Sequence, residues 1–332
     1  MLPASTRTAA AAAANGVLRR TAATTTRSTT STTTSAPSSG SSSSSSPSNS
    51  STKISTIIFD VDDCLYDVST GFTSHRNGDI IWQYMVDHLH FDNIEDAKKV
   101  RDKYFKIYHS TAKALTVAQE NGDVPSSAPK FDVKDMSKYW VDHLDYTKLF
   151  TVNDTTTVED SKRSKKELHD ALMKCDARLV AFSNGPRDYV QKVLITMGLW
   201  DLFGSNRYDE NTKDDGKFVF GVDNVLPYCK PEKEAFEKIF NVLNTYNTSS
   251  DNTPINPEEC IMIEDSMKNV RAAKALGMKT ILITGIKEEG RILPCDAPVE
   301  DDPDVDVSMA TIEEITTRLP GLFNQNPPVF EP

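Results

Sequence analysis

Short apolar runs that end in small or polar residues alternate with amphipathic segments along most of this chain. The short runs predict buried β-strands, and the amphipathic segments predict helices. Predicted strands lie at 57–59, 178–182, 260–263, 280–283 and 305–308, with a weaker one near 205–208. Predicted helices lie at 187–197, 232–243, 267–276 and 311–319. This alternation predicts an α/β fold with a right-handed parallel sheet covered on both faces.

A long helical insert interrupts this pattern after the first strand. Apolar residues recur at helical spacing over 80–89, 97–115 and 136–144, and a loop is expected at 121–135. We therefore expect an α-helical cap domain at 68–175, inserted into a core formed by 54–67 and 176–320. The polar stretch 209–225 predicts an insertion or hairpin, and the proline-rich residues 321–332 predict a loose tail.

Residues 1–53 differ in composition from the rest of the chain. They contain five basic residues and no acid, and they consist mostly of Ala, Ser and Thr. Too few large apolar groups are present to offset the entropy of ordering, so we expect disorder. The same composition is typical of an organelle transit peptide. An intracellular location follows in either case: cytoplasmic for a plain tail, mitochondrial or plastid for a transit peptide.

Charge and cysteine content exclude several classes of partner. All 48 acidic residues lie after residue 53, against 37 basic residues in the whole chain. The excess of acidic residues after residue 53 disfavours nucleic acid as a partner but permits a small phosphorylated metabolite. No run approaches the roughly 18 apolar residues of a membrane span. The five cysteines form no CxxC pair and fit a reducing compartment. The oligomeric state is left open.

Polar side chains follow or flank four of the predicted elements. The four groups are Asp60 and Asp62, Ser183 and Asn184, Lys230, and Glu264 and Asp265. Taken singly, each has an ordinary explanation as an acidic turn, a β-turn, a surface lysine or a helix cap. At one edge of one parallel sheet, however, they would supply a nucleophile, hydrogen-bond donors, a cation and acids for a metal. Such a set suits phosphoryl transfer.

With these motifs in this order, the chain resembles the haloacid dehalogenase superfamily of hydrolases over about residues 54–320. The motifs are Asp60-Val61-Asp62-Asp63-Cys64, Ser183-Asn184, Lys230-Pro231 and Glu264-Asp265-Ser266. The resemblance implies a Rossmann-like parallel core with an inserted helical cap. The segments 59–66 and 69–71 resemble the pyrimidine 5′-nucleotidase group more narrowly, through Cys64-Leu65-Tyr66 and Ser69-Thr70-Gly71.

The resemblance also implies a role for each motif residue. Asp60 would attack phosphorus and become a phosphoaspartate, and Asp62 would act as general acid and base. Mg²⁺ would be held by Asp60, the backbone carbonyl of Asp62, and Asp265, with Glu264 in the outer shell. Phosphate would be bound by Ser183, Asn184 and Lys230.

The implied function is a Mg²⁺-dependent phosphomonoesterase that hydrolyses the pyrimidine nucleoside 5′-monophosphates UMP and CMP. A sugar-phosphate phosphatase or a phosphoglucomutase-like enzyme would use the same motifs, and a non-catalytic binding protein is a further alternative. The cap would select the leaving group. Aromatic residues of the cap could stack on a nucleobase or could instead pack in the core of the cap. They are Trp82, Tyr84, Tyr104, Tyr108 and Tyr139.

Overall fold

The computed structural model describes residues 52–150, 156–204, 215–246, 254–286 and 301–332. All of them belong to one compact unit, Asn49–Pro332. Disorder or a transit peptide is expected for residues 1–53, of which 1–51 lie outside the described residues, as does the strand expected at 205–208.

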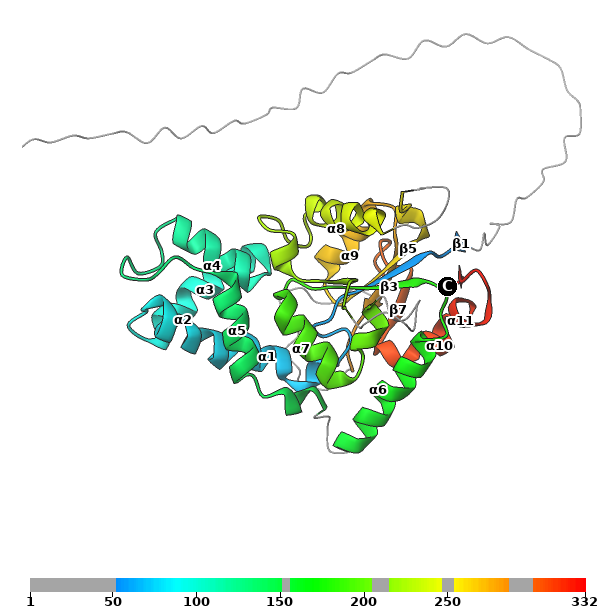
Figure 1. The fold of residues 1–332 in the computed structure, drawn as a ribbon, viewed down its shortest axis with the longest axis horizontal. Helices are drawn as coiled ribbons and strands as arrows, with labels where there is room; N and C mark the ends of the chain where they lie inside the picture. Colours follow the sequence, from blue (N-terminus) through cyan, green and yellow to red (C-terminus); the bar gives the residue numbers. More distant parts are fainter. Residues whose placement is uncertain (1–51, 151–155, 205–214, 247–253, 287–300) are drawn as a thin grey trace, which may run out of the picture. The chain divides into compact units, whose positions relative to one another are not determined.

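A six-stranded parallel sheet forms the centre of the fold and confirms the predicted α/β class (Figure 1). Its strands are β2 (Thr56–Phe59), β3 (Arg178–Phe182), β4 (Val219–Phe220), β5 (Cys260–Glu264), β6 (Lys279–Ile283) and β7 (Val307–Met309). Their order is β4-β3-β2-β5-β6-β7. The strand β2 therefore lies between β3 and β5, and the ends of all three meet at the same edge.

Helices cover both faces of the sheet, which explains why its strands are apolar on both sides. Along β2, Ile57 and Phe59 belong to the apolar cluster that includes residues of α6 (Val158–Leu172), α7 (Arg187–Met197) and α10 (Ile315–Arg318). Ile58 points to the other face, where the cluster includes residues of α8 (Lys233–Thr245) and α9 (Met267–Ala275). This alternation is the expected geometry of a strand.

The predicted helices after the cap are confirmed, with small shifts at their ends. The helix α7 ends where predicted, because Gly198 adopts the left-handed conformation at φ 71°. The helix α8 begins after Glu232, so Pro231 precedes the helix instead of occupying its first turn. The closing helix predicted at 311–319 consists of a 3₁₀ turn, Ile312–Glu314, followed by α10.

Two predictions that concern short strands are wrong, one at the edge of the six-stranded sheet and one in a separate two-stranded sheet. The stretch 209–225 contains β4, which pairs in parallel with β3 through Ala181 and Phe182. The tail is not loose, because β8 (Val329–Phe330) pairs antiparallel with β1 (Thr52–Lys53). Phe330 is buried, and the short helix α11 (Gly321–Asn324) precedes this strand. Thr52 and Lys53 are therefore part of the fold and not of a disordered segment.

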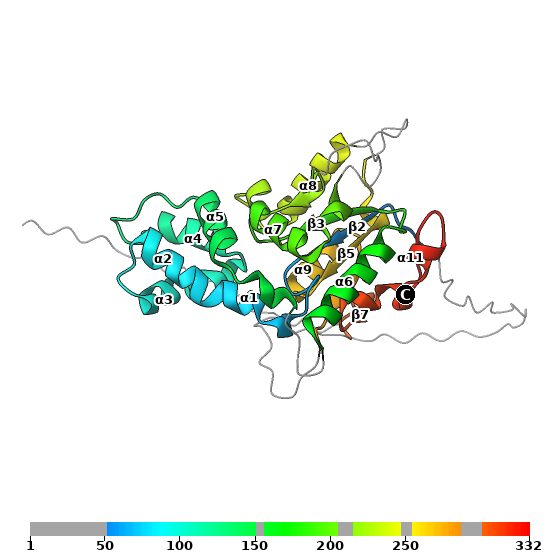
Figure 2. The ribbon, with the colours of Figure 1, turned by 60° about the horizontal axis from the view of Figure 1, so that its bottom comes forward.

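The insert after β2 is helical, as expected. Its helices are α1 (Phe72–His75), a π-helical segment Arg76–Ile80, α2 (Ile81–Leu89), α3 (Ile94–Tyr108), α4 (Thr111–Glu120) and α5 (Val133–His143). Short 3₁₀ turns occur at Val68–Thr70 and Tyr146–Phe150. The helices α2 to α5 form a group to one side of the sheet (Figure 2).

The last helix of the expected cap range, α6, lies beside the core. Lys165 of α6 pairs with Glu313 near α10, and His169 lies 3.0 Å from the carboxylate of Asp201 after α7. Figure 1 shows α6 alongside α10, and Figures 1 and 2 both show α6 away from α2 to α5. We therefore propose that the cap ends near residue 150, before α6, and not at 175.

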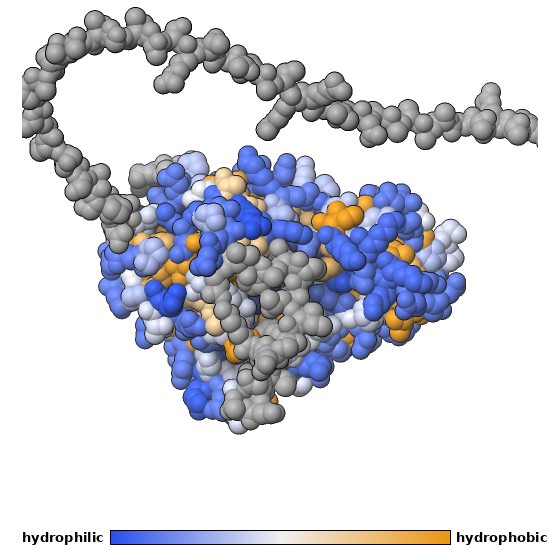
Figure 3. All heavy atoms as spheres, turned by 180° about the vertical axis from the view of Figure 1, so that it is seen from behind, coloured by the Kyte–Doolittle hydropathy of each residue, from blue (hydrophilic) through white to orange (hydrophobic). Residues whose placement is uncertain are grey.

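The surface gives no sign of a large apolar face on the side seen in Figure 3, where the described residues are mainly hydrophilic. The exposed large apolar side chains among the described residues are spread over several helices: Ile94, Ile107, Val158, Met173, Ile195 and Val242. Across the described ranges, every helix is too short or too polar to cross a bilayer.

Candidate active site

The ends of β2 and β5 bring three acids together. Asp60 directly follows β2, Glu264 is the last residue of β5, and Asp265 follows it. The strands are neighbours in register, and the amide of Asp60 donates to the carbonyl oxygen of Ile263 at 2.9 Å. Asp60 and Glu264 are almost fully buried. Local strand pairing alone therefore places the predicted nucleophile beside the predicted metal ligands.

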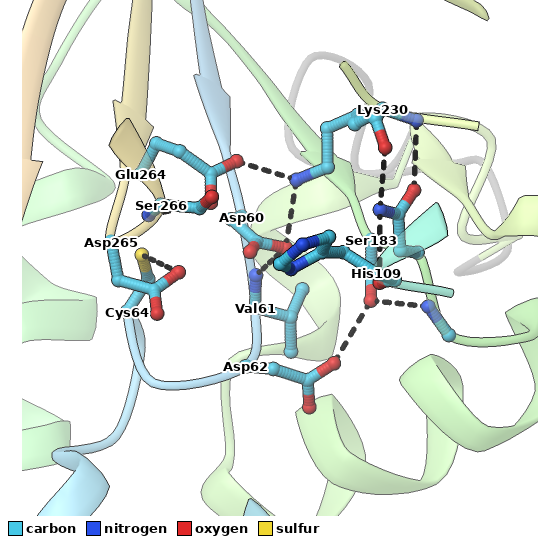
Figure 4. A network of polar contacts seen from close by, with 12 residues as sticks. Asp60, Val61, Asp62, Cys64, His109, Ser183, Lys230, Glu264, Asp265 and Ser266 are labelled. Atoms are coloured by element: carbon cyan, nitrogen blue, oxygen red, sulfur yellow. Dashed lines mark hydrogen bonds and ion pairs between the residues drawn. The ribbon is translucent and has the colours of Figure 1, made fainter. Parts of the chain in front are cut away.

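Lys230 is the cation among these acids. Its side chain has no exposed surface, and its Nζ lies 3.0 Å from Oδ1 of Asp60 and 2.7 Å from Oε2 of Glu264 (Figure 4). Burial acts to lower the pKa of Lys230, but the negative charges of Asp60 and Glu264 outweigh it and raise the pKa above its usual value. The ammonium is therefore a permanent positive charge behind the two acids.

Four side chains could hold a metal ion at this edge. Ligand atoms of Asp60, Cys64, Glu264 and Asp265 all lie within 4.8 Å of one another. Burial raises the pKa of Asp60 and of Asp265 well above the usual value, and the charge of Glu264 adds to the effect. A divalent cation would relieve this crowding, because one ammonium does not balance three carboxylates.

The donor set fits Mg²⁺, which prefers oxygen ligands. Cys64 is a poor ligand for that ion, because burial, together with the charge of Asp265, raises the pKa of its thiol and keeps it protonated. Its sulfur lies 4.0 Å from Oδ1 of Asp265 and acts as a weak donor to it.

The carboxylate of Asp62 lies apart from the metal cluster, within a set of four donors. Tyr66 and Tyr189 donate their hydroxyl groups to Oδ1 at 2.7 and 2.6 Å. Ser183 and Arg76 donate to Oδ2 at 3.1 and 2.6 Å. Burial acts to raise the pKa of Asp62, but the charge of Arg76 and these hydrogen bonds lower it. Asp62 is thus held as a carboxylate.

Ser183 and Asn184 mainly organise the loops that carry the charged groups. The amide of Lys230 donates to Oδ1 of Asn184, and Nδ2 of Asn184 donates to the carbonyl oxygen of Lys230, each at 2.9 Å. Ser183 accepts from the amide of Gly185 at 2.8 Å while it donates to Asp62. Asn184 lines the cavity described next, whereas Ser183 and Lys230 lie behind its wall.

A cavity of about 430 Å³ opens above these groups, between core and cap. The core contributes Asp60, Asp62, Asp63, Asn184, Gly185, Glu264, Asp265, Ser266 and Asn269 to its wall. The insert contributes Val68, Thr73, Ser74, Arg76, Asn77, Arg101, Phe105, His109, Ser110, Thr111 and Trp140. The cavity therefore joins an acidic floor to a wall of cap residues that includes two arginines and two aromatic rings.

The aromatic residues proposed from sequence for stacking do not line this cavity. Tyr84, Tyr104 and Tyr139 are buried in the core of the cap, and Trp82 and Tyr108 pack against the same apolar cluster. The rings that do line it are Phe105 and Trp140.

The turn between α3 and α4 docks on the core beside the acids. Oγ of Ser110 donates to the carbonyl oxygen of Asn184 at 3.2 Å, and Nε2 of His109 contacts Nζ of Lys268. The backbone of His109 is left-handed at φ 48°, a common conformation for the residue that ends a helix, here α3.

Several residues of the site escaped the sequence reasoning. Arg76 and Tyr189 have no motif signal, because they reach Asp62 only through the fold. Asp63 is the neighbour of Asp62, to which the sequence motif assigns a role. Burial together with the charge of Asp62 raises the pKa of Asp63 to about 7. Cys64 had a usable signal, since it lies four residues after Asp60 on the turn that follows the strand.

Comparison with known proteins gives the family of this fold. The family model described as haloacid dehalogenase-like hydrolase matches residues 54–277. Similar solved structures include L-2-haloacid dehalogenase from Xanthobacter autotrophicus with chloropropionic acid covalently bound, at 16% identity and a TM-score of 0.41, covering 81% of this chain and 99% of that one. CbbY from Rhodobacter sphaeroides in complex with phosphate has 15% identity to this chain and a TM-score of 0.44, and the match covers 79% of this chain and 96% of CbbY. The putative hydrolase YfnB from Bacillus subtilis, bound to magnesium, has 15% identity to this chain and a TM-score of 0.38, and the match covers 80% of this chain and 98% of YfnB.

Proposed function

This chain belongs to the haloacid dehalogenase-like hydrolases, and within that family of enzymes we propose that it is a Mg²⁺-dependent phosphomonoesterase. The observation that carries the proposal is the buried Lys230, which lies between Asp60 and Glu264 with Asp265 close by, at one end of a cavity. A phosphate dianion needs positive charge on its oxygens and a nucleophile in line with its leaving group, and this arrangement supports both requirements.

In the proposed reaction, Asp60 is the nucleophile. Lys230 and the amide of Val61 both contact its Oδ1, at 3.0 and 2.8 Å, so we assign the attack to Oδ2. The bond from Oδ2 to phosphorus forms while the bond from phosphorus to the leaving oxygen breaks. Asp62, which the site favours as a carboxylate, must first take up a proton from solvent. It then gives that proton to the leaving oxygen and later accepts one from the water that hydrolyses the phosphoaspartate.

Asp60 and Asp265 would hold the metal together with the backbone carbonyl of Asp62, and Glu264, which pairs with Lys230, would act from the outer shell. Bound Mg²⁺ would supply positive charge opposite the phosphate oxygens. Asn184 and Lys230 would complete the phosphate site, Lys230 through its charge and Asn184 through the loop that it holds.

Removal of divalent ions should abolish hydrolysis. Without a cation, the three carboxylates would repel a phosphate dianion across a few ångströms of buried space. The measurement is turnover of a phosphomonoester after exhaustive treatment with EDTA and after Mg²⁺ is added back. Ca²⁺ should restore much less activity, because it favours looser coordination than Mg²⁺. Full turnover in EDTA would show that the assigned metal site is wrong.

For the substrate we propose a pyrimidine nucleoside 5′-monophosphate, UMP or CMP. The resemblance at Cys64-Leu65-Tyr66 favours this class, and the cavity size supports a ligand of nucleotide dimensions. Phe105, which is partly exposed, offers aromatic surface on which a base can stack. The same cavity also fits a sugar phosphate, which is the alternative substrate.

UMP and CMP should therefore be the best substrates in a ranked assay. The measurement is kcat/KM for UMP, CMP, AMP, GMP and several sugar phosphates, with 2-chloropropionate included as a test of dehalogenation. An advantage of more than about tenfold, or roughly 1.4 kcal/mol in transition-state binding, for a purine nucleotide or sugar phosphate would overturn the pyrimidine assignment alone. Release of chloride without phosphatase activity would overturn the phosphomonoesterase proposal.

A further inference from the structure

Arg76 is a cap residue that reaches into the core. It begins the π-helical segment Arg76–Ile80 that follows α1, and it is only 7% exposed. Its guanidinium carbon lies 5.2 Å from the ring centre of Trp140 and 4.9 Å from that of Tyr189. Trp140 belongs to the cap and Tyr189 to the core, so rings from both domains hold the guanidinium group.

The guanidinium also contacts the proposed general acid. Its Nη1 lies 2.6 Å from Oδ2 of Asp62 and donates to the hydroxyl of Tyr189 at 2.8 Å. Tyr189 in turn donates to Oδ1 of Asp62. Arg76 therefore acts on the carboxylate at both oxygens, at Oδ2 directly and at Oδ1 through the tyrosine.

The other donors to Asp62 come from the core. Tyr66 follows β2, Ser183 follows β3, and Tyr189 lies on α7. Among the described contacts of Asp62, that of Arg76 is the one that connects the carboxylate to the cap. With two donors at each oxygen, the plane of this carboxylate is set.

We propose that Arg76 is a positioning residue, which sets the orientation of Asp62 for proton transfer to the leaving group and makes that orientation depend on the placement of the cap. This inference rests on the proposed function. It differs from two simpler roles. A purely structural ion pair would only join cap to core, and a substrate-binding arginine would act on the phosphate or on the leaving group itself.

The leaving group separates these roles. An alkyl oxygen, as in a nucleoside 5′-monophosphate, needs a proton as it departs, whereas p-nitrophenolate departs without one. The parameter kcat/KM covers the steps up to that departure. A residue that positions the general acid should therefore matter for the alkyl ester and much less for the aryl ester.

The experiment compares the full-length enzyme with Arg76→Met and Tyr189→Phe on UMP and on p-nitrophenyl phosphate. If UMP proves a poor substrate, the best alkyl ester of the ranked assay replaces it. Arg76→Met should lower kcat/KM for the alkyl ester by on the order of 10²-fold, and for the aryl ester by less than about fivefold. Tyr189→Phe keeps the ion pair, so it should show the same selectivity with a smaller loss even if Arg76→Met folds poorly. The control is Arg163→Met, which removes an exposed arginine of α6 that pairs with Asp160 outside the cavity; it should change kcat/KM appreciably for neither ester.

Equal losses on both esters in Arg76→Met and Tyr189→Phe would overturn the positioning role in favour of a structural or phosphate-binding one, and so would unchanged kinetics. Failure of the unsubstituted enzyme to hydrolyse either ester is a separate result, which would overturn the proposed function itself.

Discussion

Asp60→Asn should be inactive while it remains folded. An amide cannot attack phosphorus, and loss of a catalytic nucleophile costs at least on the order of 10⁴-fold in kcat. Folding should survive, because the substitution removes one negative charge beside Glu264 and Asp265, and Lys230 keeps its 2.7 Å contact with Glu264. Steady-state turnover measures the loss of activity, and a thermal unfolding curve measures whether the variant is still folded.

The matched control is Asp142→Asn. Asp142 is an exposed acid of the cap that pairs with Lys138 and does not line the cavity, and its substitution should change neither turnover nor stability appreciably. If Asp60→Asn keeps more than about a tenth of normal turnover, covalent catalysis at this residue is ruled out.

Lys230→Met should lose both activity and stability. The ammonium is completely buried between two acids, so its removal leaves Asp60 and Glu264 without their positive partner. Removing one member of a buried ion pair costs about 3–5 kcal/mol in the free energy of unfolding. Mg²⁺ should restore more stability to this variant than to the unsubstituted protein, because it is the remaining cation for the cluster.

The control for this result is a double-mutant cycle with Glu264→Gln. In that background one buried charge is already absent, so Lys230→Met should cost less stability than it does alone. Equal costs in the two backgrounds, measured by denaturant unfolding, would show that the ion pair contributes nothing to stability.

The sheet was predictable because most of its strands are apolar runs of four or five residues with helices after them. β4 escaped prediction for a physical reason. It is only Val219–Phe220, two residues in a polar stretch, and it becomes a strand by pairing with β3 at the edge of the sheet. The ordered C-terminal tail was not predicted for the same reason, because β8 has only two residues and forms a strand by pairing with β1.

The acidic floor of the cavity was predictable because each of its residues ends or directly follows a strand. Parallel pairing of β2 with β5 is then enough to bring Asp60, Glu264 and Asp265 together. The orientation of Asp62 was not predictable. Its partners Ser183 and Tyr189 lie 121 and 127 positions further along the chain, and Arg76 belongs to the cap.

Cap residues that face the cavity could not be selected by periodicity. Helical spacing identifies the apolar side of a helix, which in α2 and α5 is the core of the cap itself. Trp140 and Tyr139 are neighbours in sequence, yet only Trp140 lines the cavity. The choice depends on how the helices are packed together, and no local pattern carries that information.

The central claim is that phosphate passes through a covalent bond to Asp60, and direct trapping tests it best. The enzyme is mixed with excess phosphomonoester and Mg²⁺ and quenched in acid within one turnover, and its peptides are examined by mass spectrometry. We expect one phosphoryl group on the peptide that contains Asp60, stable in acid and lost in mild base as expected of an acyl phosphate. Full product formation with no phosphorylated peptide at any time point, or with the phosphoryl group on another residue, would contradict it.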